Sequence, residues 1–264
     1  MLLTFLLLAS SLVFLRTCLP VYLFTHYNSR MSPVALVTGG AHRLGRVFAL
    51  TLARHGFDII LHYHRASDAA IQTRADLESV GSRVTLAQAD LTNPAQIHSL
   101  ISNLESLDIL VNSAAYMPSG NVATLSVENW DVSLDLNLRA PFLLAQACAD
   151  KMTNGGLIVN ITDVGAWKAW SRFPSYTVSK AALESLTRIL ARAYAPGIRV
   201  NAIAPGFVLQ SDIVPAQEWE RLIGRVPLKR PAQPEEIASA LEFLLENQYI
   251  TGQTIVVDGG YSLV

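Results

Sequence analysis

The chain has 264 residues, of which 51% are hydrophobic and 16% are charged, and its formal net charge is −1. Such a sequence can bury a large core, which excludes a disordered protein, and its lack of a basic excess does not fit a general nucleic-acid-binding protein. The cysteines, Cys18 and Cys148, are far apart, and neither they nor the histidines have metal-ligand spacing. We therefore expect no disulfide framework and no metal site, and a reducing, cytoplasmic compartment fits best.

The first 30 residues form an apolar extension, running from Met1 to Leu15 and again from Leu19 to Phe24, with Arg16 between the two runs. A membrane-spanning helix needs about 20 apolar residues, and a central charge is costly. A secretory signal usually has a basic start, which is missing here. A membrane anchor, an exported protein and a start at Met31 are the alternatives. We favour Met31, because it leads directly into the first expected strand, and we expect membrane contact only if residues 1–30 are translated.

From Pro33 onward, short apolar runs alternate with stretches long enough for helices. Most runs are continuous, as expected for parallel strands covered by helices on both faces. This order predicts that residues 31–264 form one Rossmann-type α/β domain with a doubly wound parallel sheet of about seven strands. The expected strands are Val34–Thr38, Asp58–His62, Arg83–Gln88, Asp108–Asn112, Leu157–Ile161, Arg199–Ile203 and Thr254–Val257.

A glycine-rich loop follows the first expected strand and precedes an apolar helix expected from Arg46 to Arg54. Glycine lets a backbone approach a pyrophosphate closely, and a helix N-terminus supplies free N–H groups and a positive dipole end. The loop therefore predicts dinucleotide binding, although an ordinary strand-to-helix turn could contain the same glycines. Its candidate binding residues are Gly39, Arg43, Leu44 and Gly45.

The second expected strand ends without an acidic residue and runs into His64 and Arg65. An NAD site needs Asp or Glu about 20 residues past the loop, whereas an NADP site needs cations. A guanidinium group suits the 2′-phosphate of NADP. We therefore predict NADP(H) as the cofactor, with Arg65 as the main contact and His64, Ser67 and Arg43 as helpers. A solvated basic strand end is the alternative.

Tyr176 and Lys180 are the strongest candidates for catalytic residues. They lie four positions apart, and residues with this spacing share one face of a helix. An ammonium group beside a phenol is expected to lower the phenol's pKa from about 10 toward working pH. Such a phenol can exchange a proton with a carbonyl oxygen while hydride moves at a nicotinamide. Alone the pair is weak, because it is usually a helix surface, but here it accompanies the loop and the strand order.

Together these segments resemble the short-chain dehydrogenase/reductase family from Pro33 to the C-terminus. The resemblance implies that Asn112 lies beside the cofactor, that Asn137 holds a water leading to Lys180, and that Lys180 also binds the nicotinamide ribose. It further implies that Pro205 and Gly206 line the nicotinamide pocket and that the protein is a homodimer or homotetramer. The matching segments are Thr38 to Gly45, Asp90-Leu91, Asn112 to Ala115, Asn137, Tyr176 to Lys180, Arg199 to Gly206, Thr251 to Gln253 and Val257 to Gly260.

The segment Asp90-Leu91 follows the third expected strand. Asp90 could contact the adenine edge of the cofactor, or it could be the N-cap of the next helix. The sequence leaves both alternatives open.

Two departures from the family pattern are informative. Asp163 stands thirteen residues before Tyr176, where the family has its catalytic serine, and Arg43 replaces a glycine of the loop. A carboxylate opposes ionisation of a neighbouring phenol, so it suits plain ketone reduction less than a hydroxyl does. It suits a cationic or amino-bearing heterocycle whose ring nitrogen must be protonated. Both departures resemble the pteridine reductase branch, which reduces pterins and folates with NADPH.

The expected substrate pocket includes Tyr116 and Met117, one of which takes the place of an aromatic ring in that branch. Trp167 and its neighbours Trp170 and Phe173 could stack on a flat substrate, although core packing or a subunit interface would also use them. Asp163 has a second interpretation. It could cap a helix or pair with a nearby cation, either Lys168 or Arg172.

The main hypothesis is an NADPH-dependent reductase acting on a pteridine, with Asp163, Tyr176, Lys180 and Asn137 as the catalytic set. The first alternative is a carbonyl reductase, such as a 3-oxoacyl thioester reductase. A non-catalytic NADP-binding regulator and a membrane-anchored reductase of a lipid or steroid are the remaining alternatives. Each of the catalytic hypotheses requires a small-molecule substrate, and none requires a nucleic acid.

Overall fold

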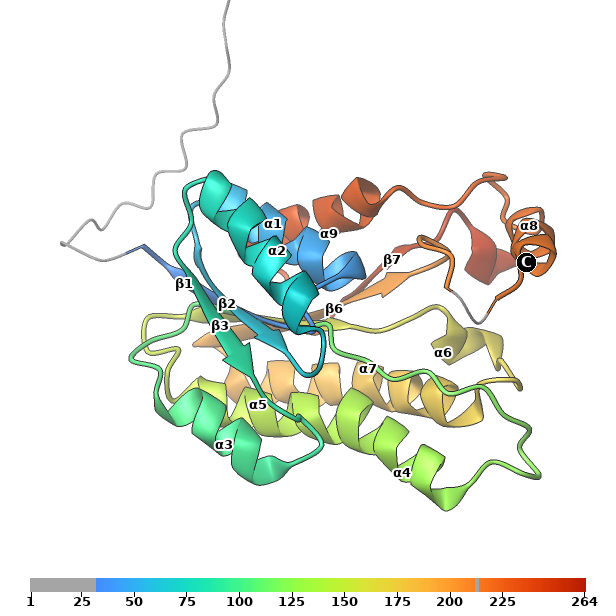
Figure 1. Ribbon diagram of the computed structural model, residues 1–264, viewed down its shortest axis with the longest axis horizontal. Helices are drawn as coiled ribbons and strands as arrows, with labels where there is room; N and C mark the ends of the chain where they lie inside the picture. Colours follow the sequence, from blue (N-terminus) through green and yellow to red (C-terminus); the bar gives the residue numbers. More distant parts are fainter. Residues whose placement is uncertain (1–31, 212–213) are drawn as a thin grey trace, which may run out of the picture. The chain divides into compact units, whose positions relative to one another are not determined.

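A computed structural model describes residues 32–211 and 214–264, and residues 1–30, the predicted extension, lie outside the described residues. The described chain forms the predicted Rossmann-type α/β fold around one seven-stranded parallel sheet of order β3-β2-β1-β4-β5-β6-β7 (Figure 1). The strands are β1 Val34–Thr38, β2 Asp58–Tyr63, β3 Val84–Gln88, β4 Ile109–Asn112, β5 Gly156–Ile161, β6 Ile198–Pro205 and β7 Thr254–Val257. The predicted strands are all present, with ends that differ by up to two residues.

Helices cover both faces of the sheet, with α1, α2 and α9 on one side and α3, α4, α5 and α7 on the other (Figure 1). Continuous apolar strands are buried between these two layers, which accounts for their lack of alternation. Among the described residues, no helix is both long and apolar enough to cross a bilayer. The helices are α1 Arg43–Arg54, α2 Ser67–Ser79, α3 Pro94–Ser102, α4 Val127–Leu134, α5 Ala140–Ala149, α6 Gly165–Lys168, α7 Pro174–Tyr194, α8 Ala216–Ile223 and α9 Pro234–Glu246, with a π-helical turn η1 at Asp135–Arg139 and a 3-10 turn η2 at Tyr261–Leu263.

The chain order reverses between β1 and β4, which are adjacent in the sheet. At such a switch point the loops after the two strands separate and leave a crevice at the carboxyl edge. Thr38, the last residue of β1, fixes the loop after β4: its Oγ1 donates to the carbonyl of Val111 at 3.3 Å and accepts from the amides of Ser113 at 3.0 Å and Ala114 at 3.1 Å.

Helix α1 begins at Arg43, three residues before the predicted start. The amide of Arg46 already donates to the carbonyl of His42, so the first helical turn contains the residues that were assigned to the loop. Arg43 has a φ of 52°, in the left-handed region, where a residue other than glycine carries some backbone strain. The helix N-terminus therefore lies inside the glycine-rich loop rather than after it.

A buried histidine connects this loop to its neighbouring strands. Nδ1 of His62 accepts from the amide of Gly39 at 3.1 Å, and Nε2 of His62 lies 3.0 Å from the carbonyl of Ala89. Because Nδ1 is an acceptor, the proton of the neutral ring is on Nε2, which donates to Ala89. Burial lowers the pKa of His62 from 6.5 to about 4. The ring therefore remains neutral at pH 7 and holds both hydrogen bonds.

We predict that His62 makes the fold acid-sensitive. Because the folded state lowers the pKa of His62 from 6.5 to about 4, its contribution is present above pH 6.5 and is lost as the pH falls toward 4, by roughly 3 kcal/mol in all. Urea unfolding at several pH values measures this loss. His62→Gln should be less stable at pH 7 but should lose less stability over this window, whereas His98→Gln, on the exposed side of α3, should retain the full slope. An identical slope in His62→Gln would refute the assignment.

Candidate active site

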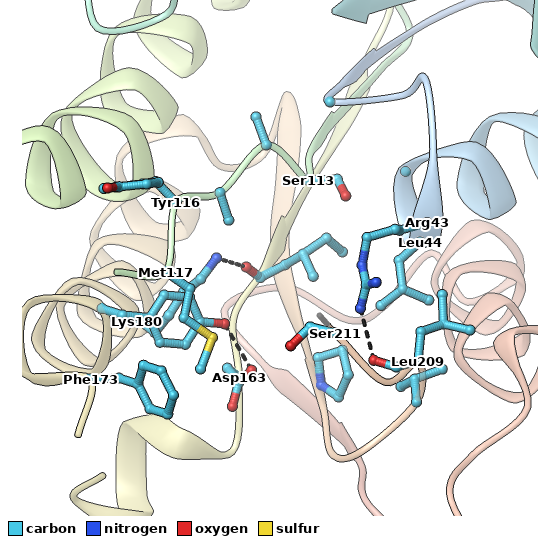
Figure 2. Close-up of a pocket in the computed structure, with 18 of the residues that line it drawn as sticks. Arg43, Leu44, Ser113, Tyr116, Met117, Asp163, Phe173, Lys180, Leu209 and Ser211 are labelled. Carbon is cyan, nitrogen blue, oxygen red and sulfur yellow. Dashed lines mark hydrogen bonds between the residues drawn. The ribbon is translucent and has the colours of Figure 1, made fainter. Parts of the chain in front are cut away.

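A cleft of about 1490 Å³ opens at the carboxyl edge of the sheet. Its walls come from the segments that follow β1 to β6, together with residues from α7 and α8, so regions distant in sequence meet there (Figure 2). The predicted residues that line it are Gly39, Arg43, Leu44, Gly45, His64, Arg65, Asp90, Leu91, Tyr116, Met117, Asp163, Tyr176, Lys180, Pro205 and Gly206.

Two glycines of the loop leave no room for a side chain. A Cβ on Gly45 would lie 2.1 Å from the carbonyl oxygen of Gly39, and a Cβ on Gly39 would lie 2.9 Å from Cα of Ala114. Gly39 also has a φ of 62°, which favours glycine. The loop can therefore close tightly over the N-terminus of α1, where free amides and the helix dipole suit a pyrophosphate.

The strand ends beside this loop fit a 2′-phosphorylated dinucleotide. His64 and Arg65 line the cleft after β2, and the end of this strand carries no acid that would hold a ribose 2′-hydroxyl. Ser67 is the exposed first residue of α2 and is not among the residues that line the cleft, so its contact with a 2′-phosphate stays a prediction. Together with the crowded glycines, the cations make the cleft suitable for NADP(H).

Asp90 faces this end of the cleft and does not cap the following helix. Its Oδ1 accepts from the amide of Thr92 at 2.9 Å and from the hydroxyl at 2.7 Å. These bonds hold the pKa of Asp90 below its usual range. Helix α3 is capped instead by Asn93, whose side chain accepts from the amide of Ala95, so the N-cap alternative for Asp90 is wrong.

Arg43 crosses the cleft instead of projecting freely toward a 2′-phosphate. Its guanidinium donates to the carbonyl of Leu209 at 2.8 Å and to that of Gln210 at 3.2 Å, in the loop after β6 (Figure 2). The backbone of Arg43 is left-handed at the start of α1, and this conformation sets the direction in which its side chain leaves the backbone. The predicted contact of Arg43 with a phosphate would therefore compete with these two carbonyls.

Asp163 and Tyr176 meet in the middle of the cleft. Asp163 follows β5, and its Oδ2 accepts from the hydroxyl of Tyr176 at 2.8 Å. Its Oδ1 accepts from the amide of Gly165 at 2.7 Å, at the first turn of α6. Asp163 therefore holds the amide of the first residue of α6 and the hydroxyl of Tyr176 at the same time, although the N-cap residue of this helix is Val164. The cations considered as its partners bind elsewhere: Lys168 donates to the carbonyl of Val264, and Arg172 donates to Glu218.

Burial determines the charges of the three central groups. It raises the pKa of Asp163 to about 6, and it raises the pKa of Tyr176 well above 10, with the Asp163 carboxylate adding to the effect. It lowers the pKa of Lys180 to about 8. The ammonium of Lys180 donates to the carbonyl of Ile161 at 2.6 Å and lies 5.6 Å from the centroid of the Tyr176 ring. The predicted lowering of the pKa of Tyr176 is therefore wrong, because burial and the Asp163 carboxylate raise it.

The two predicted asparagines form hydrogen bonds behind the residues that line the cleft. The side-chain amide of Asn112 donates to Oδ1 of Asn160 at 2.8 Å in the core, and Asn112 is not among the residues that line the cleft. Its place beside the cofactor stays a prediction. The side chain of Asn137, in η1, accepts from the amide of Tyr116 at 2.8 Å and donates to its carbonyl at 2.9 Å and to Oγ of Ser179 at 2.9 Å. Asn137 thus fixes the segment after β4 against α7.

The predicted substrate-pocket residues do not all face the space beside Asp163. Met117 extends toward Asp163 and Phe173, whereas the ring of Tyr116 points away from them (Figure 2), and its hydroxyl donates to Asn129 at 3.1 Å. Trp167 does not line the cleft, because its indole turns to Glu184 and donates to Oε2 at 2.9 Å. Met117 is therefore the better candidate for the substrate slot.

Several residues that line the cleft were not predicted as site residues. Trp170 and Phe173 were expected only as possible stacking partners. Others come from segments whose position depends on tertiary packing, and they include Phe207, Trp219, Leu222, Arg225 and Tyr261.

We expect Arg65 to select NADPH over NADH. Arg65→Gln removes a cation that suits a 2′-phosphate, and one charge-assisted contact is worth about 1.5–3 kcal/mol. The KM for NADPH should therefore rise tenfold or more, while the KM for NADH should change little. Steady-state kinetics with both cofactors measure this, and Arg74→Gln, on α2 outside the cleft, is the matched control. Equal changes for both cofactors would place Arg65 outside the 2′-phosphate site.

The chain is similar to known proteins along most of its length. A family model described as enoyl-(acyl carrier protein) reductase matches residues 39–262. The chain is 36% identical over 246 residues to the 1-cyclohexenylcarbonyl-CoA reductase of Streptomyces collinus, covering 88% of this chain and 87% of that protein. It is 34% identical over 237 residues to the 3-oxoacyl-[acyl-carrier-protein] reductase of a Synechocystis strain, covering 86% and 96%.

Among solved structures, the chain is similar to FolM alternative dihydrofolate reductase 1 from Brucella canis in complex with NADP. The two chains superpose with a TM-score of 0.80 at 36% identity, over 88% of this chain and 95% of the other.

Proposed function

Because the chain belongs to the short-chain dehydrogenase/reductase family and is an NADP-dependent reductase, we propose that its substrate is a pteridine ring, as in dihydropterins and dihydrofolate. The observation that carries this proposal is the hydrogen bond of 2.8 Å between Tyr176 and Asp163. A largely buried carboxyl group with a raised pKa faces the cleft beside a phenol that keeps its proton.

This pair suits reduction of a C=N bond, because the product nitrogen must take up a proton. NADPH, when bound, supplies the hydride. Since burial raises the pKa of Asp163 to about 6, about a tenth of this group carries a proton at pH 7, far more than for an ordinary aspartate. The phenol of Tyr176 keeps its proton and orients the carboxyl group through its hydrogen bond to Oδ2. Asp163 therefore delivers one proton to the ring nitrogen, directly or through water, and takes up another from the solvent.

Lys180 and Asn137, the other members of the catalytic set, position the cofactor and the segments of the cleft. Lys180, with its pKa lowered to about 8, is still a cation at neutral pH, and we propose that it holds the nicotinamide ribose. The carbonyl of Ile161 fixes its ammonium. Asn137 holds the segment that carries Met117, and Met117 and Phe173 lie beside Asp163, where they can flank a flat ring (Figure 2).

The comparisons support two substrate classes. The likeness to an alternative dihydrofolate reductase favours a pteridine. The relatives that act on acyl-CoA and 3-oxoacyl carrier-protein thioesters favour a carbonyl or enoyl substrate. Asp163 decides our preference, because a carboxylate beside the phenol raises the phenol's pKa, which opposes the phenolate that some carbonyl reductions use.

We also propose that the protein is a homodimer or homotetramer in the cytoplasm. The exposed side chains of Phe142 on α5 and of Val178 and Ile189 on α7 support self-association, since a second copy would bury them.

The direct test is NADPH oxidation by the purified protein with dihydrobiopterin, dihydrofolate, simple ketones and a 3-oxoacyl thioester offered separately. We expect turnover of the pteridines. Asp163→Ser should lower kcat/KM for the pteridines at least a hundredfold, because general acid catalysis contributes about 10²–10⁴-fold, and should retain or improve any ketone activity. Lys168→Ser, which alters a neighbouring residue outside the cleft lining, is the control. Turnover of the thioester alone would contradict the pteridine assignment.

A further inference from the structure

A row of aromatic rings leads from the catalytic centre to helix α8. Phe173 lies three residues before Tyr176, and its ring centroid is 6.4 Å from that of Trp170. Trp170 is stacked with Phe207 at 6.2 Å, and Phe207 meets Trp219 of α8 edge-on at 5.6 Å. All four residues line the cleft. One wall can therefore contact a flat, extended group that continues beyond the reacting ring.

Positive charges outnumber negative charges at the α8 end of this aromatic wall. Arg172 and Glu218 line the cleft there and pair at 2.9 Å, so their charges offset each other. Arg225 also lines the cleft, just past α8, next to Val226, which packs against the aromatic rings. Among the described residues, no carboxylate lies within ion-pair distance of Arg225. The far end of the wall therefore carries an excess positive charge that faces the cleft.

We propose that Arg225 binds a carboxylate at the end of an aromatic arm carried by the substrate. Resting on the proposed function, this selects folates, whose pteridine carries a p-aminobenzoylglutamate arm, over pterins with a short neutral side chain. The pteridine lies at Asp163, the aminobenzoyl ring lies along the wall formed by Trp170, Phe207 and Trp219, and a glutamate carboxylate accepts from Arg225.

Both parts of the arm, the benzoyl ring and the glutamate carboxylate, match the chemistry of this wall. A benzoyl ring stacks on or meets aromatic side chains edge-on with favourable energy, and these contacts need no charge. A guanidinium binds a carboxylate through two parallel hydrogen bonds, which fixes the orientation of the arm. Because Arg225 is exposed, both charges remain partly hydrated, so binding does not require the desolvation of a buried ion pair.

The test compares dihydrofolate with dihydrobiopterin, which share the reacting ring and differ in the arm. We expect Arg225→Gln to lower the ratio of kcat/KM for dihydrofolate to that for dihydrobiopterin about tenfold, which corresponds to about 1.4 kcal/mol, and to act mainly through the KM of dihydrofolate. The effect should shrink at high salt, as expected for an exposed charge. Arg221→Gln, an exposed arginine of α8 outside the cleft lining, is the matched control and should keep the wild-type ratio.

Binding without turnover gives a second readout. Free p-aminobenzoylglutamate should inhibit the wild-type protein in competition with dihydrofolate, and Arg225→Gln should raise its inhibition constant about tenfold. The aminobenzoate half alone, which keeps a carboxylate but lacks the glutamate, should inhibit more weakly than the whole arm.

The outcomes separate this inference from the proposed function. If the wild-type protein reduces both pteridines and Arg225→Gln leaves the ratio unchanged, or Arg221→Gln lowers it equally, the carboxylate subsite is wrong and the pteridine assignment stands. If the wild-type protein reduces neither pteridine but does reduce a 3-oxoacyl thioester, the proposed function is wrong and the subsite is overturned with it.

Discussion

The site depends on one hydrogen bond between two partly desolvated groups, the phenol of Tyr176 and the carboxyl of Asp163. Burial makes ionisation costly for both, so the pKa of each is raised, and the shared proton is the least costly arrangement. Lys180, four residues further along α7, contributes a cation whose own pKa is lowered by the same burial. The cleft therefore presents a proton source with a cation behind it, which is a poor site for stabilising a phenolate and a good one for protonating nitrogen.

The fold produces this arrangement by bringing strand ends together. The switch between β1 and β4 opens the crevice, and Thr38 and His62 fix the loops on either side of it. Asp163 is placed by the end of β5 and by its hydrogen bond from the amide of Gly165, so its orientation does not depend on Tyr176 alone. The asparagines that face the core contribute indirectly: Asn137 fixes the segment after β4, which supplies Met117.

Much of the fold could be predicted from the sequence because its signals are local. Continuous apolar runs identified all seven strands, and the glycines of the loop identified the crowded turn at Gly39 and Gly45. The errors concern side chains whose direction depends on distant partners. Trp167 and Trp170 are three residues apart, yet only Trp170 faces the cleft, because Glu184 on α7 binds the indole of Trp167. In the same way, burial of Tyr176 by the assembled domain reversed the direction of the pKa shift that a neighbouring lysine suggested.

The protonation state of Asp163 tests the central claim most directly. Infrared difference spectra recorded across a pH titration, with Asp163→Asn subtracted, isolate the signal of this one carboxyl group. We predict a protonated carboxyl band that disappears with a midpoint near pH 6. A midpoint near the ordinary value for aspartate, about 3.9, would mean that Asp163 is fully ionised at neutral pH and acts only as a hydrogen-bond acceptor, which would contradict its role as the proton source.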